Sequence, residues 1–248
     1  MLNKNQAYFG DYCEIIKDIP DASIDMVLID PPFGITDCEW DKSGFSLDTM
    51  WTELKRVIKP TGVIAAHSIQ PFTTDLIVSN RKWFKYNYIW IKSQAANFQL
   101  AKKMPLKKHE EICIFYNKKP TYNPQMWKGK MKAKRIGKNV YQKRKSDMFL
   151  SSKPANLEVV MSDMYHPTTI LQYPGVARNK SLHRTQKPVA LEEFLIKTYT
   201  NPGDCVLDPT AGSGTTAVAA KKTGRDFIVI EREKNYYDVM LKRIENET

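Results

Sequence analysis

One segment near the end of this 248-residue chain constrains the fold more than any other, because a strand, a small-residue turn and a helix follow one another in it. The predicted strand 205–207 ends at Asp208, and a helix is predicted over 215–222. Between them lie Gly212 and Gly214, which let the backbone approach a ligand without a Cβ in the way. The first turn of the helix offers free N–H donors. The segment therefore predicts a ligand site at the end of a sheet strand.

The acidic residue that ends the next strand narrows the choice of ligand. Strand 227–230 ends at Glu231, nineteen positions after Gly212, where a carboxylate can bind both hydroxyls of a ribose. The turn lacks the third glycine of a dinucleotide site and the Gly-Lys-Ser/Thr of a phosphate-binding loop. A nucleoside without phosphates fits better, and S-adenosylmethionine (SAM) is the commonest such ligand. The alternative is a turn that serves packing only.

A second candidate site follows a buried strand in the first part of the chain. Strand 25–29 ends at Asp30, and Pro31 and Pro32 force the chain to turn there. Open α/β sheets bind ligands at the carboxyl ends of their strands. Asp30 and the Pro31 carbonyl form a rigid pair of acceptors, and Phe33 offers a flat apolar face. Together they could bind a planar aromatic amine; a strand-ending turn with a core phenylalanine is the alternative.

The rest of the pattern is that of an α/β protein. Short apolar strands alternate with amphipathic helices, which is typical of a parallel sheet. Ser46 is placed to cap a helix with apolar residues at helical spacing, and Pro188 fits the first residue of another. Further strands are predicted at 7–9, 63–66, 86–91 and 111–116, and further helices at 12–19 and around 237–244. From 117 to about 181 the periodicity fades, and no internal structure is predicted.

The charge of the chain is concentrated in one stretch. Lys and Arg number 38 against 27 Asp and Glu, a net charge of +11. Between Lys118 and Lys153 there are twelve basic residues and one acid, Asp147, so this stretch alone carries +11. A basic segment suits a polyanion, because each Lys or Arg on a phosphate releases counterions; a solvated loop is the alternative. We interpret 118–180 as an inserted recognition region, and 1–117 with 181–248 as one domain.

Composition and cysteine spacing exclude several classes of protein. Apolar residues make up 42% and charged residues 26%, as in folded soluble proteins. No stretch reaches the roughly 18 apolar residues of a membrane span, and the first residues do not resemble a secretory signal. The four cysteines are scattered, with no histidine at ligand spacing, so we expect reduced thiols, no metal site and a cytoplasmic location. His67, His109 and His166 are isolated and are interpreted as surface or core histidines.

Three motifs together resemble the amino-methyltransferases of DNA, the SAM-dependent enzymes that methylate adenine N6 or cytosine N4. They are DPPFG at 30–34, LHRTQKP at 182–188 and DPTAGSGTT at 208–216. Their order, with the basic segment between the first motif and the other two, resembles the family's β arrangement. The resemblance covers about 6–116 and 181–244. It implies a Rossmann-like SAM-methyltransferase fold: a mostly parallel twisted sheet with helices on both faces and a small inserted basic lobe.

The resemblance implies a role for each residue of the first motif. Asp30 and the Pro31 carbonyl would accept hydrogen bonds from the target amino group, in a turn that Pro32 makes rigid. Phe33 would stack on the extruded base; many members have Tyr there, so this chain keeps the ring and loses a hydroxyl. These four residues are the expected catalytic site.

The cofactor site follows from the same resemblance. Glu231 would bind the ribose of SAM, Asp11 would lie near its adenine, and Gly212 and Gly214 would approach its methionine end. Many members have Phe in place of Thr210, which puts any packing on SAM at that position in question. The full set of expected cofactor-binding residues is Asp11, Asp30, Thr185, Gln186, Lys187, Asp208, Thr210, Ala211, Gly212, Ser213, Gly214, Thr215, Thr216 and Glu231.

Duplex DNA is the partner that the resemblance implies, since such enzymes carry their target-recognition region in the basic middle segment. The expected DNA-binding residues are Lys128, Lys130, Lys132, Lys134, Arg135, Lys138, Lys143, Arg144 and Lys145. No membrane partner is expected, and the location is the cytoplasm of a prokaryotic cell, with a phage-encoded protein as the other case. A homodimer and a cognate restriction enzyme are left open as further partners.

Adenine N6 is the expected target, with cytosine N4 as the alternative. Family members with Asp first in the catalytic motif are mostly adenine enzymes, whereas Ser is more typical of cytosine N4. Cytosine C5 methylation needs a nucleophilic cysteine, usually after proline, and none of the four cysteines follows one. A DNA-binding module with an inactive pocket is disfavoured by the intact Asp30, AGSG turn and Glu231. Enzymes that methylate RNA or a protein glutamine amide often use Asn-Pro-Pro and place the cofactor motif first.

Overall fold

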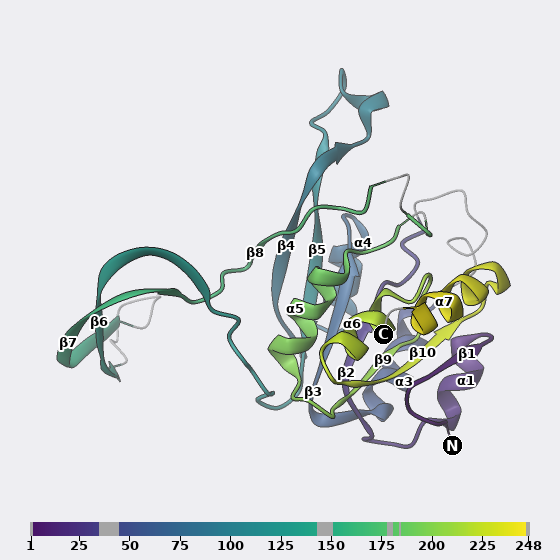
Figure 1. Ribbon diagram of the computed structural model, residues 1–248, viewed down its shortest axis with the longest axis horizontal. Helices are drawn as coiled ribbons and strands as arrows, with labels where there is room; N and C mark the ends of the chain where they lie inside the picture. The colour runs from purple at the N-terminus through teal and green to yellow at the C-terminus, as the bar shows by residue number, and fades with distance from the viewer. Residues whose placement is uncertain (1, 35–44, 143–150, 178–180, 184, 247–248) are drawn as a thin grey trace. The chain divides into compact units, whose positions relative to one another are not determined.

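The computed structural model describes residues 2–34, 45–142, 151–177, 181–183 and 185–246, and of 135–142 and 151–158 it describes the backbone. These residues form two compact units, one of 1–123 with 168–248 and the other of 124–167. The first unit contains an eight-stranded sheet in the order β1-β10-β9-β2-β3-β5-β4-β8 (Figure 1). The second contains a two-stranded sheet, β6-β7.

The predicted α/β pattern of the first unit is confirmed, and several element ends match closely. Its strands are β1 (Gln6–Phe9), β2 (Ile24–Ile29), β3 (Ile58–Ser68), β4 (Phe84–Ala96), β5 (Lys107–Phe115), β8 (Ile170–Gln172), β9 (Cys205–Asp208) and β10 (Asp226–Glu231). Its helices are α1 (Tyr12–Ile15), η1 (Ile16–Asp18), α3 (Leu47–Val57), α4 (Phe72–Ser79), η2 (Phe98–Leu100), α5 (Val189–Tyr199), α6 (Thr215–Lys222) and α7 (Lys234–Asn246). Ser46 caps α3, since its hydroxyl accepts the Thr49 N–H at 3.3 Å. Pro188 is the N-cap of α5 instead of its first residue.

The sheet is mostly parallel, as predicted, with one strand reversed. β1, β10, β9, β2 and β3 pair in parallel, and so do β4 and β8. β5 is antiparallel to both of its neighbours, β3 and β4. The reason is the short connection 97–106 between β4 and β5, which carries one turn of 3₁₀ helix; a parallel crossover needs a dozen or more residues. β4 and β5 therefore form a long hairpin at one side of the sheet.

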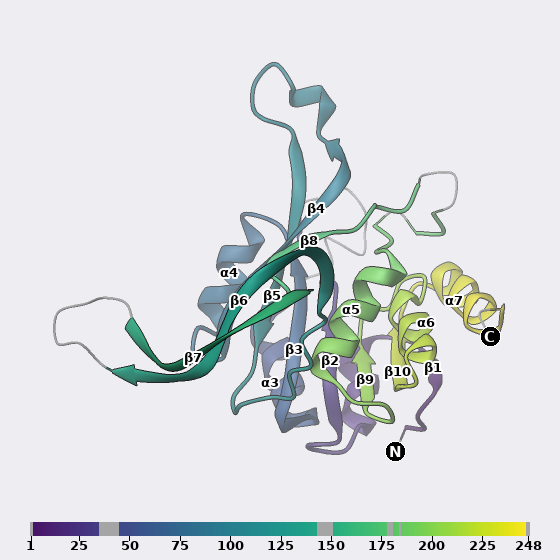
Figure 2. The ribbon, with the colours of Figure 1, turned by 60° about the vertical axis from the view of Figure 1, so that its left-hand side comes forward.

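Two hydrophobic cores lie on the two faces of the sheet. Alternate residues of β2 point to opposite faces: Met26 packs in one core and Val27 in the other. The first core includes residues of α5, α6 and α7, and the second includes residues of η1, α3 and α4. Figure 2 shows α5, α6 and α7 gathered along one face. In the second core the Trp51 ring lies 4.8 Å from Phe115 and its indole N–H donates to Ser79 Oγ at 2.8 Å. The sheet is thus buried on both faces, which leaves its edges for function.

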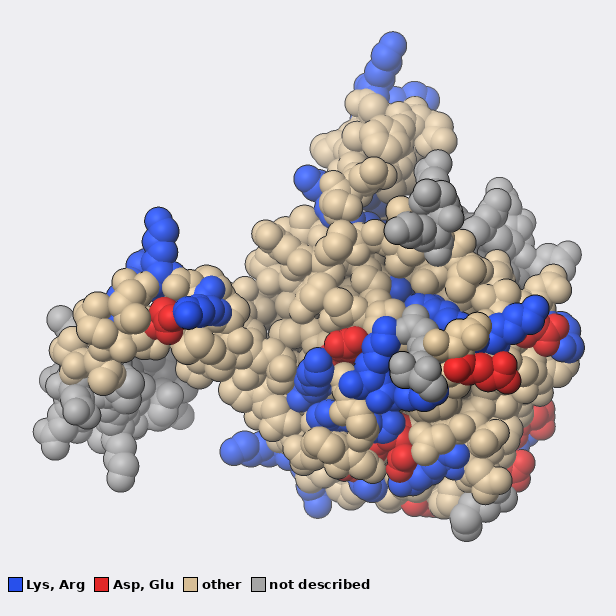
Figure 3. Space-filling view, viewed as in Figure 1, with Lys and Arg blue, Asp and Glu red and all other residues tan. Residues whose placement is uncertain are grey.

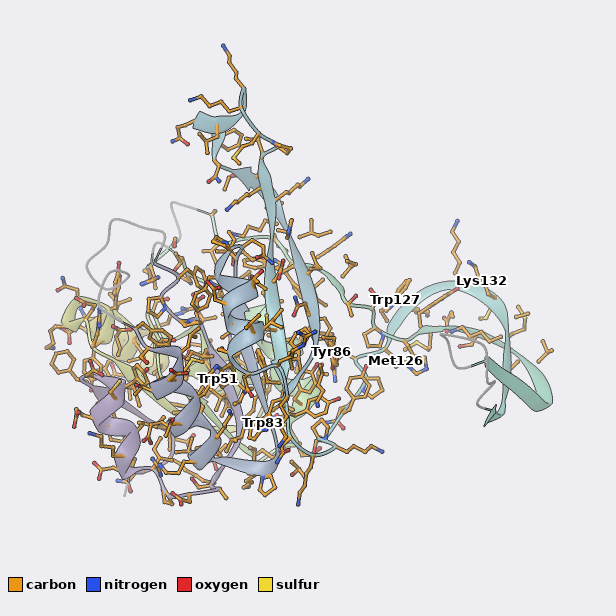
Figure 4. All side chains as sticks on the ribbon, turned by 180° about the vertical axis from the view of Figure 1, so that it is seen from behind. Trp51, Trp83, Tyr86, Met126, Trp127 and Lys132 are labelled. Carbon is orange, nitrogen blue, oxygen red and sulfur yellow. The ribbon has the colours of Figure 1, made fainter. Side chains whose placement is uncertain are left out.

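The second unit is a ribbon of β6 (Trp127–Gln142) paired antiparallel with β7 (Ser151–Tyr165). The sequence predicts no structure here, although Lys128, Lys130, Lys132 and Lys134 recur with the period of two that marks a strand. This pattern does not predict a strand by the usual criterion, because the alternating residues are lysines instead of apolar residues. At the first residue of β6 the ring of Trp127, which is labelled in Figure 4, stacks on the Tyr165 ring with the ring centres 4.7 Å apart.

None of the helices in the described part of the chain has the length and apolarity that crossing a membrane requires.

Candidate active site

The two motifs that the sequence places in different halves of the chain meet in the sheet. β2, which ends before Asp30, pairs in parallel with β9, which ends at Asp208. The contact is direct, since the Asp30 N–H donates to Thr210 Oγ1 at 3.2 Å across 180 positions of sequence. A cavity of about 350 Å³ opens at this point and is lined by residues of both motifs. It lies where strand connections diverge to opposite sides of the sheet, the usual ligand site of an open α/β sheet.

The cavity contains nearly every residue expected at the active site. All four expected catalytic residues line it, Asp30, Pro31, Pro32 and Phe33. The expected cofactor-binding residues that line it are Asp11, Asp30, Thr185, Gln186, Lys187, Asp208, Thr210, Ala211, Gly212, Ser213, Thr215, Thr216 and Glu231. Gly214 does not line the cavity. It has φ +77° at the start of α6, and a Cβ there would lie 2.6 Å from Met240 Cγ, so this glycine lets α7 pack closely.

Asp30 has one oxygen held and one oxygen without a partner. Lys187 Nζ donates to Asp30 Oδ2 at 2.6 Å and lies 3.7 Å from Glu110 Oε2. Burial lowers the pKa of Lys187, but the Asp30 and Glu110 carboxylates outweigh this and hold the pKa above its ordinary value. Lys187 is therefore a permanent cation in the cavity wall. Asp30 Oδ1 is buried and accepts no hydrogen bond within the described structure, so one acceptor of this carboxylate is unused there.

Three further polar side chains of the cavity wall were not predicted from the sequence. His67 Nε2 and Glu192 Oε1 lie 2.9 Å apart, and both side chains are almost completely buried. Glu110 binds Lys92; burial raises its pKa, but Lys187 and Lys92 outweigh this and lower the pKa below its usual value. His67 is a core histidine, one of the two cases that the sequence left open, but it is not isolated. Its partner is 125 positions away, and no local pattern in the sequence signals such a pair.

These side chains add to the unpartnered atoms at the cavity. His67 Nδ1, Glu110 Oε2 and Glu192 Oε2 are buried without a hydrogen-bond partner among the described residues, as is Asp30 Oδ1. Buried polar atoms are normally paired, so four exceptions around one cavity indicate a site built for a polar ligand or ordered water. Three of the four are carboxylate oxygens, which favour a ligand with hydrogen-bond donors or positive charge.

The small-residue turn presents backbone and a carboxylate to the same cavity. Gly212 has φ +53°, a left-handed conformation that favours glycine, and its N–H donates to Glu231 Oε2 at 2.7 Å. The other oxygen, Oε1, accepts the Glu233 N–H at 2.7 Å. Burial raises the pKa of Glu231, and these backbone N–H groups partly offset the rise. Each oxygen keeps a second lone pair, so the carboxylate can still accept two hydroxyl groups.

Asp208 holds the turn in shape. Its carboxylate accepts the Thr210 N–H at 3.0 Å and the Thr216 hydroxyl at 2.5 Å, which joins the end of β9 to the start of α6. Burial raises the pKa of Asp208 to about 7, although both hydrogen bonds act in the opposite direction. The Thr210 hydroxyl oxygen accepts the Asp30 backbone N–H. This residue therefore links the two motifs.

The 182–188 segment forms another wall of the cavity. The His183 ring lies 4.1 Å from Tyr236, and the Thr185 N–H donates to His183 Nδ1 at 3.2 Å. Burial lowers the pKa of His183, which favours the neutral ring. Gln186 Oε1 accepts the Leu182 N–H at 2.8 Å and so closes the segment on itself. Arg184 lies outside the described residues.

The aromatic side chains of Tyr12, Phe33 and Phe45 line the cavity. Phe33 lies 5.4 Å from Phe72, ring centre to ring centre, at an interplanar angle of 44°. The ring centres of Tyr12 and Phe45 lie 6.0 Å apart. Asp11, which precedes Tyr12 and also lines the cavity, caps α1 by accepting the Cys13 N–H at 2.8 Å. The site thus offers flat apolar surfaces beside its charged groups.

Those expected DNA-binding residues that the structure describes lie in the second unit, on β6. Lys128, Lys130, Lys132 and Lys134 are on β6, and the exposed Lys132 is labelled in Figure 4. Lys134 Nζ lies 4.1 Å from the centre of the Tyr165 ring, and Lys128 lies 3.5 Å from Asp163. Arg135 and Lys138 are on the same strand, and only their backbone is described; Lys143, Arg144 and Lys145 lie outside the described residues.

Comparison with known proteins agrees with this geometry. A family model described as DNA methylase, that of the N6/N4 methyltransferases, matches residues 24–242. The Type II methyltransferase M.BglII of Bacillus subtilis is 29% identical over 263 residues, which cover 98% of this chain and 69% of that protein. The crystal structure of the M1.HpyAVI–SAM complex has a TM-score of 0.63 at 24% identity and covers 96% of this chain and 98% of its own. PvuII DNA methyltransferase, cytosine-N4-specific, has a TM-score of 0.67 at 16% identity and covers 98% of this chain and 87% of its own.

The fold and the family match together define a SAM-dependent DNA amino-methyltransferase. The chain belongs to the N6/N4 DNA methylase family. This confirms the predicted fold class and SAM as the cofactor, and leaves open which exocyclic amine is methylated.

Proposed function

We propose that this chain transfers the methyl group of SAM to the exocyclic N6 amine of an adenine flipped out of a specific duplex DNA sequence. The observation that carries the proposal is the pairing of Asp30 with the cofactor turn in one cavity. The unpartnered Asp30 Oδ1 is a buried acceptor, and the backbone of Gly212 and the carboxylate of Glu231 line the same space. An amine acceptor and a nucleoside site in contact are what methyl transfer to an amine requires.

The residues present fit SAM. The Glu231 carboxylate keeps two lone pairs for the ribose hydroxyls, and Tyr12 and Phe45 provide an apolar wall near Asp11 for the adenine. Lys187 and Thr185 lie near the motif expected to receive the methionine end. When bound, SAM supplies an electrophilic methyl group on a sulfonium.

Asp30 would act on the amine. An exocyclic amine is a weak nucleophile because its lone pair is delocalised into the ring. Acceptors at Asp30 Oδ1 and the Pro31 carbonyl would favour a more tetrahedral nitrogen with its lone pair available. Lys187 occupies the other oxygen, Oδ2, so the free oxygen points in one fixed direction. The amine proton that is lost on methylation then has an acceptor at Asp30, and Phe33 supplies the ring on which the base stacks.

The ribbon of the second unit would hold the DNA. A two-stranded ribbon fits the major groove, and its lysines would contact phosphates. Removing a base from the stack costs a few kcal/mol, which such contacts help to offset. The sequence that is recognised, a homodimer and a cognate restriction enzyme are not assigned. The named relative M.BglII is bacterial, which supports a bacterial cytoplasmic location.

Adenine is favoured over cytosine by the Asp at the start of the catalytic motif, and cytosine N4 is the alternative. The test is to incubate the purified chain with methyl-deuterated SAM and unmethylated duplex DNA, digest the DNA and identify the labelled nucleoside by mass spectrometry. We expect labelled N6-methyladenine. Labelled N4-methylcytosine would select the alternative, and an absence of label in DNA despite SAM binding by calorimetry would support an inactive DNA-binding module. Sequencing of methylated bases in cells that express the chain then gives the target sequence.

A further inference from the structure

The hairpin of β4 and β5 extends beyond the edge of the sheet that contains the active site. Figures 1 and 2 show it projecting away from the rest of the first unit. Its base is part of the cavity wall, because Glu110 of β5 lines the cavity and pairs with Trp90 of β4. The strands continue to the pair Ala96 and Lys107, and residues 97–106 close the hairpin. We call residues 97–106 the hairpin tip.

The hairpin tip and the strand ends below it are basic and apolar at once. From Lys92 to Lys108 there are five lysines and no acidic residue. Four of them lie at or just below the tip, Lys102, Lys103, Lys107 and Lys108. Figure 3 shows lysine side chains at the far end of the projection among uncharged residues. This charge is separate from the basic ribbon, and the assignment of DNA binding to β6 does not account for it.

Large apolar side chains of the hairpin tip are exposed. Phe98 is 62% exposed, Met104 47% and Leu100 38%. Phe98 and Leu100 are held on η2, which begins after Asn97 in a left-handed conformation (φ +64°). Single exposed apolar residues are ordinary, but three on one ten-residue projection indicate a surface that contacts a partner. A partner that accepts both flat apolar rings and lysines is a nucleic acid, whose bases stack and whose phosphates bind cations.

The hairpin is long enough for its tip to reach the gap that an extruded base leaves in the duplex. Lys107, the last residue of β5 before the tip, lies three positions from Glu110 along extended strand, which places the start of the tip about 10 Å beyond Glu110. The major groove is about 8.5 Å deep, so the tip can reach the base stack while the cavity holds the extruded base. Extrusion leaves a gap in the stack, and DNA-binding proteins commonly insert apolar side chains between bases that they unstack.

We propose that the hairpin tip inserts into the duplex beside the target base, with Phe98 filling the gap that the extruded base leaves. Lys102 and Lys103 bind the flanking phosphates and hold the tip in place. This inference rests on the proposed function, because it requires that the chain flips a base out of duplex DNA. It assigns to the first unit a DNA contact that is independent of the ribbon.

The test compares variants on two synthetic duplexes that carry the methylated sequence found by sequencing. One duplex is fully paired, and the other has an abasic site opposite the target base, which makes extrusion easier. On the paired duplex, Phe98→Ala should lower kcat/KM for methylation on the order of tenfold, the effect of losing one base-stacking ring. On the abasic duplex it should be within about twofold of wild type, since less stacking has to be replaced.

A matched control separates this effect from a general loss of apolar surface. Val78 on α4 is 66% exposed and lies outside the hairpin, so Val78→Ala should match wild type on both duplexes. Met104→Ser changes a tip side chain that does not fill the gap, so it should lose less activity on the paired duplex than Phe98→Ala. Thermal melting and SAM calorimetry of each variant establish that it is folded.

Two results would overturn the inference while the wild-type chain methylates DNA. One is a Phe98→Ala variant that equals wild type on the paired duplex or loses the same factor on both duplexes. The other is a fall in the sedimentation mass of the DNA-free protein on Phe98→Ala, which would show that the tip joins two copies of the chain. A wild-type chain that transfers no methyl group to either duplex would instead refute the proposed function.

Discussion

Replacing Lys187 by methionine should destabilise the chain far more than the loss of an ordinary lysine. The side chain is 8% exposed, and its Nζ lies 2.6 Å from Asp30 Oδ2 and 3.7 Å from Glu110 Oε2. At an effective dielectric constant of about 20, a charge pair at 2.6 Å attracts by about 6 kcal/mol. Part of this offsets desolvation, and breaking buried pairs typically costs about 3–5 kcal/mol because a buried charge is left without a partner. We expect Lys187→Met to lower the free energy of unfolding by that amount.

Urea denaturation of wild type and variant at pH 8 measures the loss. Adding Asp30→Asn to Lys187→Met should recover part of the lost stability, because it removes the carboxylate charge that Lys187→Met leaves unpaired. The matched control is Lys197→Met, which breaks a partly exposed pair with Glu193 at 3.2 Å and should cost less than about 1 kcal/mol. A Lys187→Met variant no less stable than Lys197→Met at pH 8 would refute the reasoning.

Three further predictions follow from the site. Asp30→Asn should lower the rate of methyl transfer on the order of 10²–10³-fold, because it removes a charged acceptor of the amine. The SAM affinity measured by calorimetry should stay within a few-fold of wild type. An equal loss of methyl transfer and of SAM affinity would mean that Asp30 serves the cofactor instead. Asp208→Asn should flatten the pH dependence of the free energy of unfolding. Burial raises the pKa of Asp208 from 3.8 to about 7, so the folded state binds a proton more tightly than the unfolded state does. The wild type therefore loses stability as the pH rises from about 4 through 7. Thermal melts of the two proteins without SAM would contradict this if the melting temperature changed with pH equally in wild type and Asp208→Asn. Gly214→Ala should lower the free energy of unfolding by about 1–3 kcal/mol in urea titrations, because the glycine has φ +77° and the new Cβ would lie 2.6 Å from Met240 Cγ. A change below about 0.5 kcal/mol would show that α7 shifts freely.

The parts of the fold that local chemistry determines could be predicted from the sequence. Helix 215–222 has the same bounds in the prediction and in the structure, since a glycine turn begins it and Gly224 follows it. Ser46 was identified as a cap because a hydroxyl before an apolar periodic stretch satisfies free N–H groups. The placement of Asp30 and Gly212 around one cavity was also predictable, because the strands of a parallel sheet end at one edge.

Long-range pairing explains what the sequence did not reveal. The reversal of β5 depends on a ten-residue connection folding as a hairpin tip, and the strand pattern is the same in either direction. The ribbon of β6 and β7 was missed because its alternating residues are lysines. Glu192 is an ordinary polar position in an amphipathic helix until His67 is placed beside it by the sheet. Such pairs join residues more than a hundred positions apart and leave no local signal.

A crystal structure of the chain with a non-reactive SAM analogue and duplex DNA containing its methylated sequence tests the central claim most directly. The claim predicts the target adenine outside the duplex, its amine donating to Asp30 Oδ1, and the amine nitrogen about 3–3.5 Å from the position of the transferable methyl group. The analogue should contact Glu231 and Gly212. An analogue bound elsewhere, or a target amine that does not reach Asp30, would contradict the account.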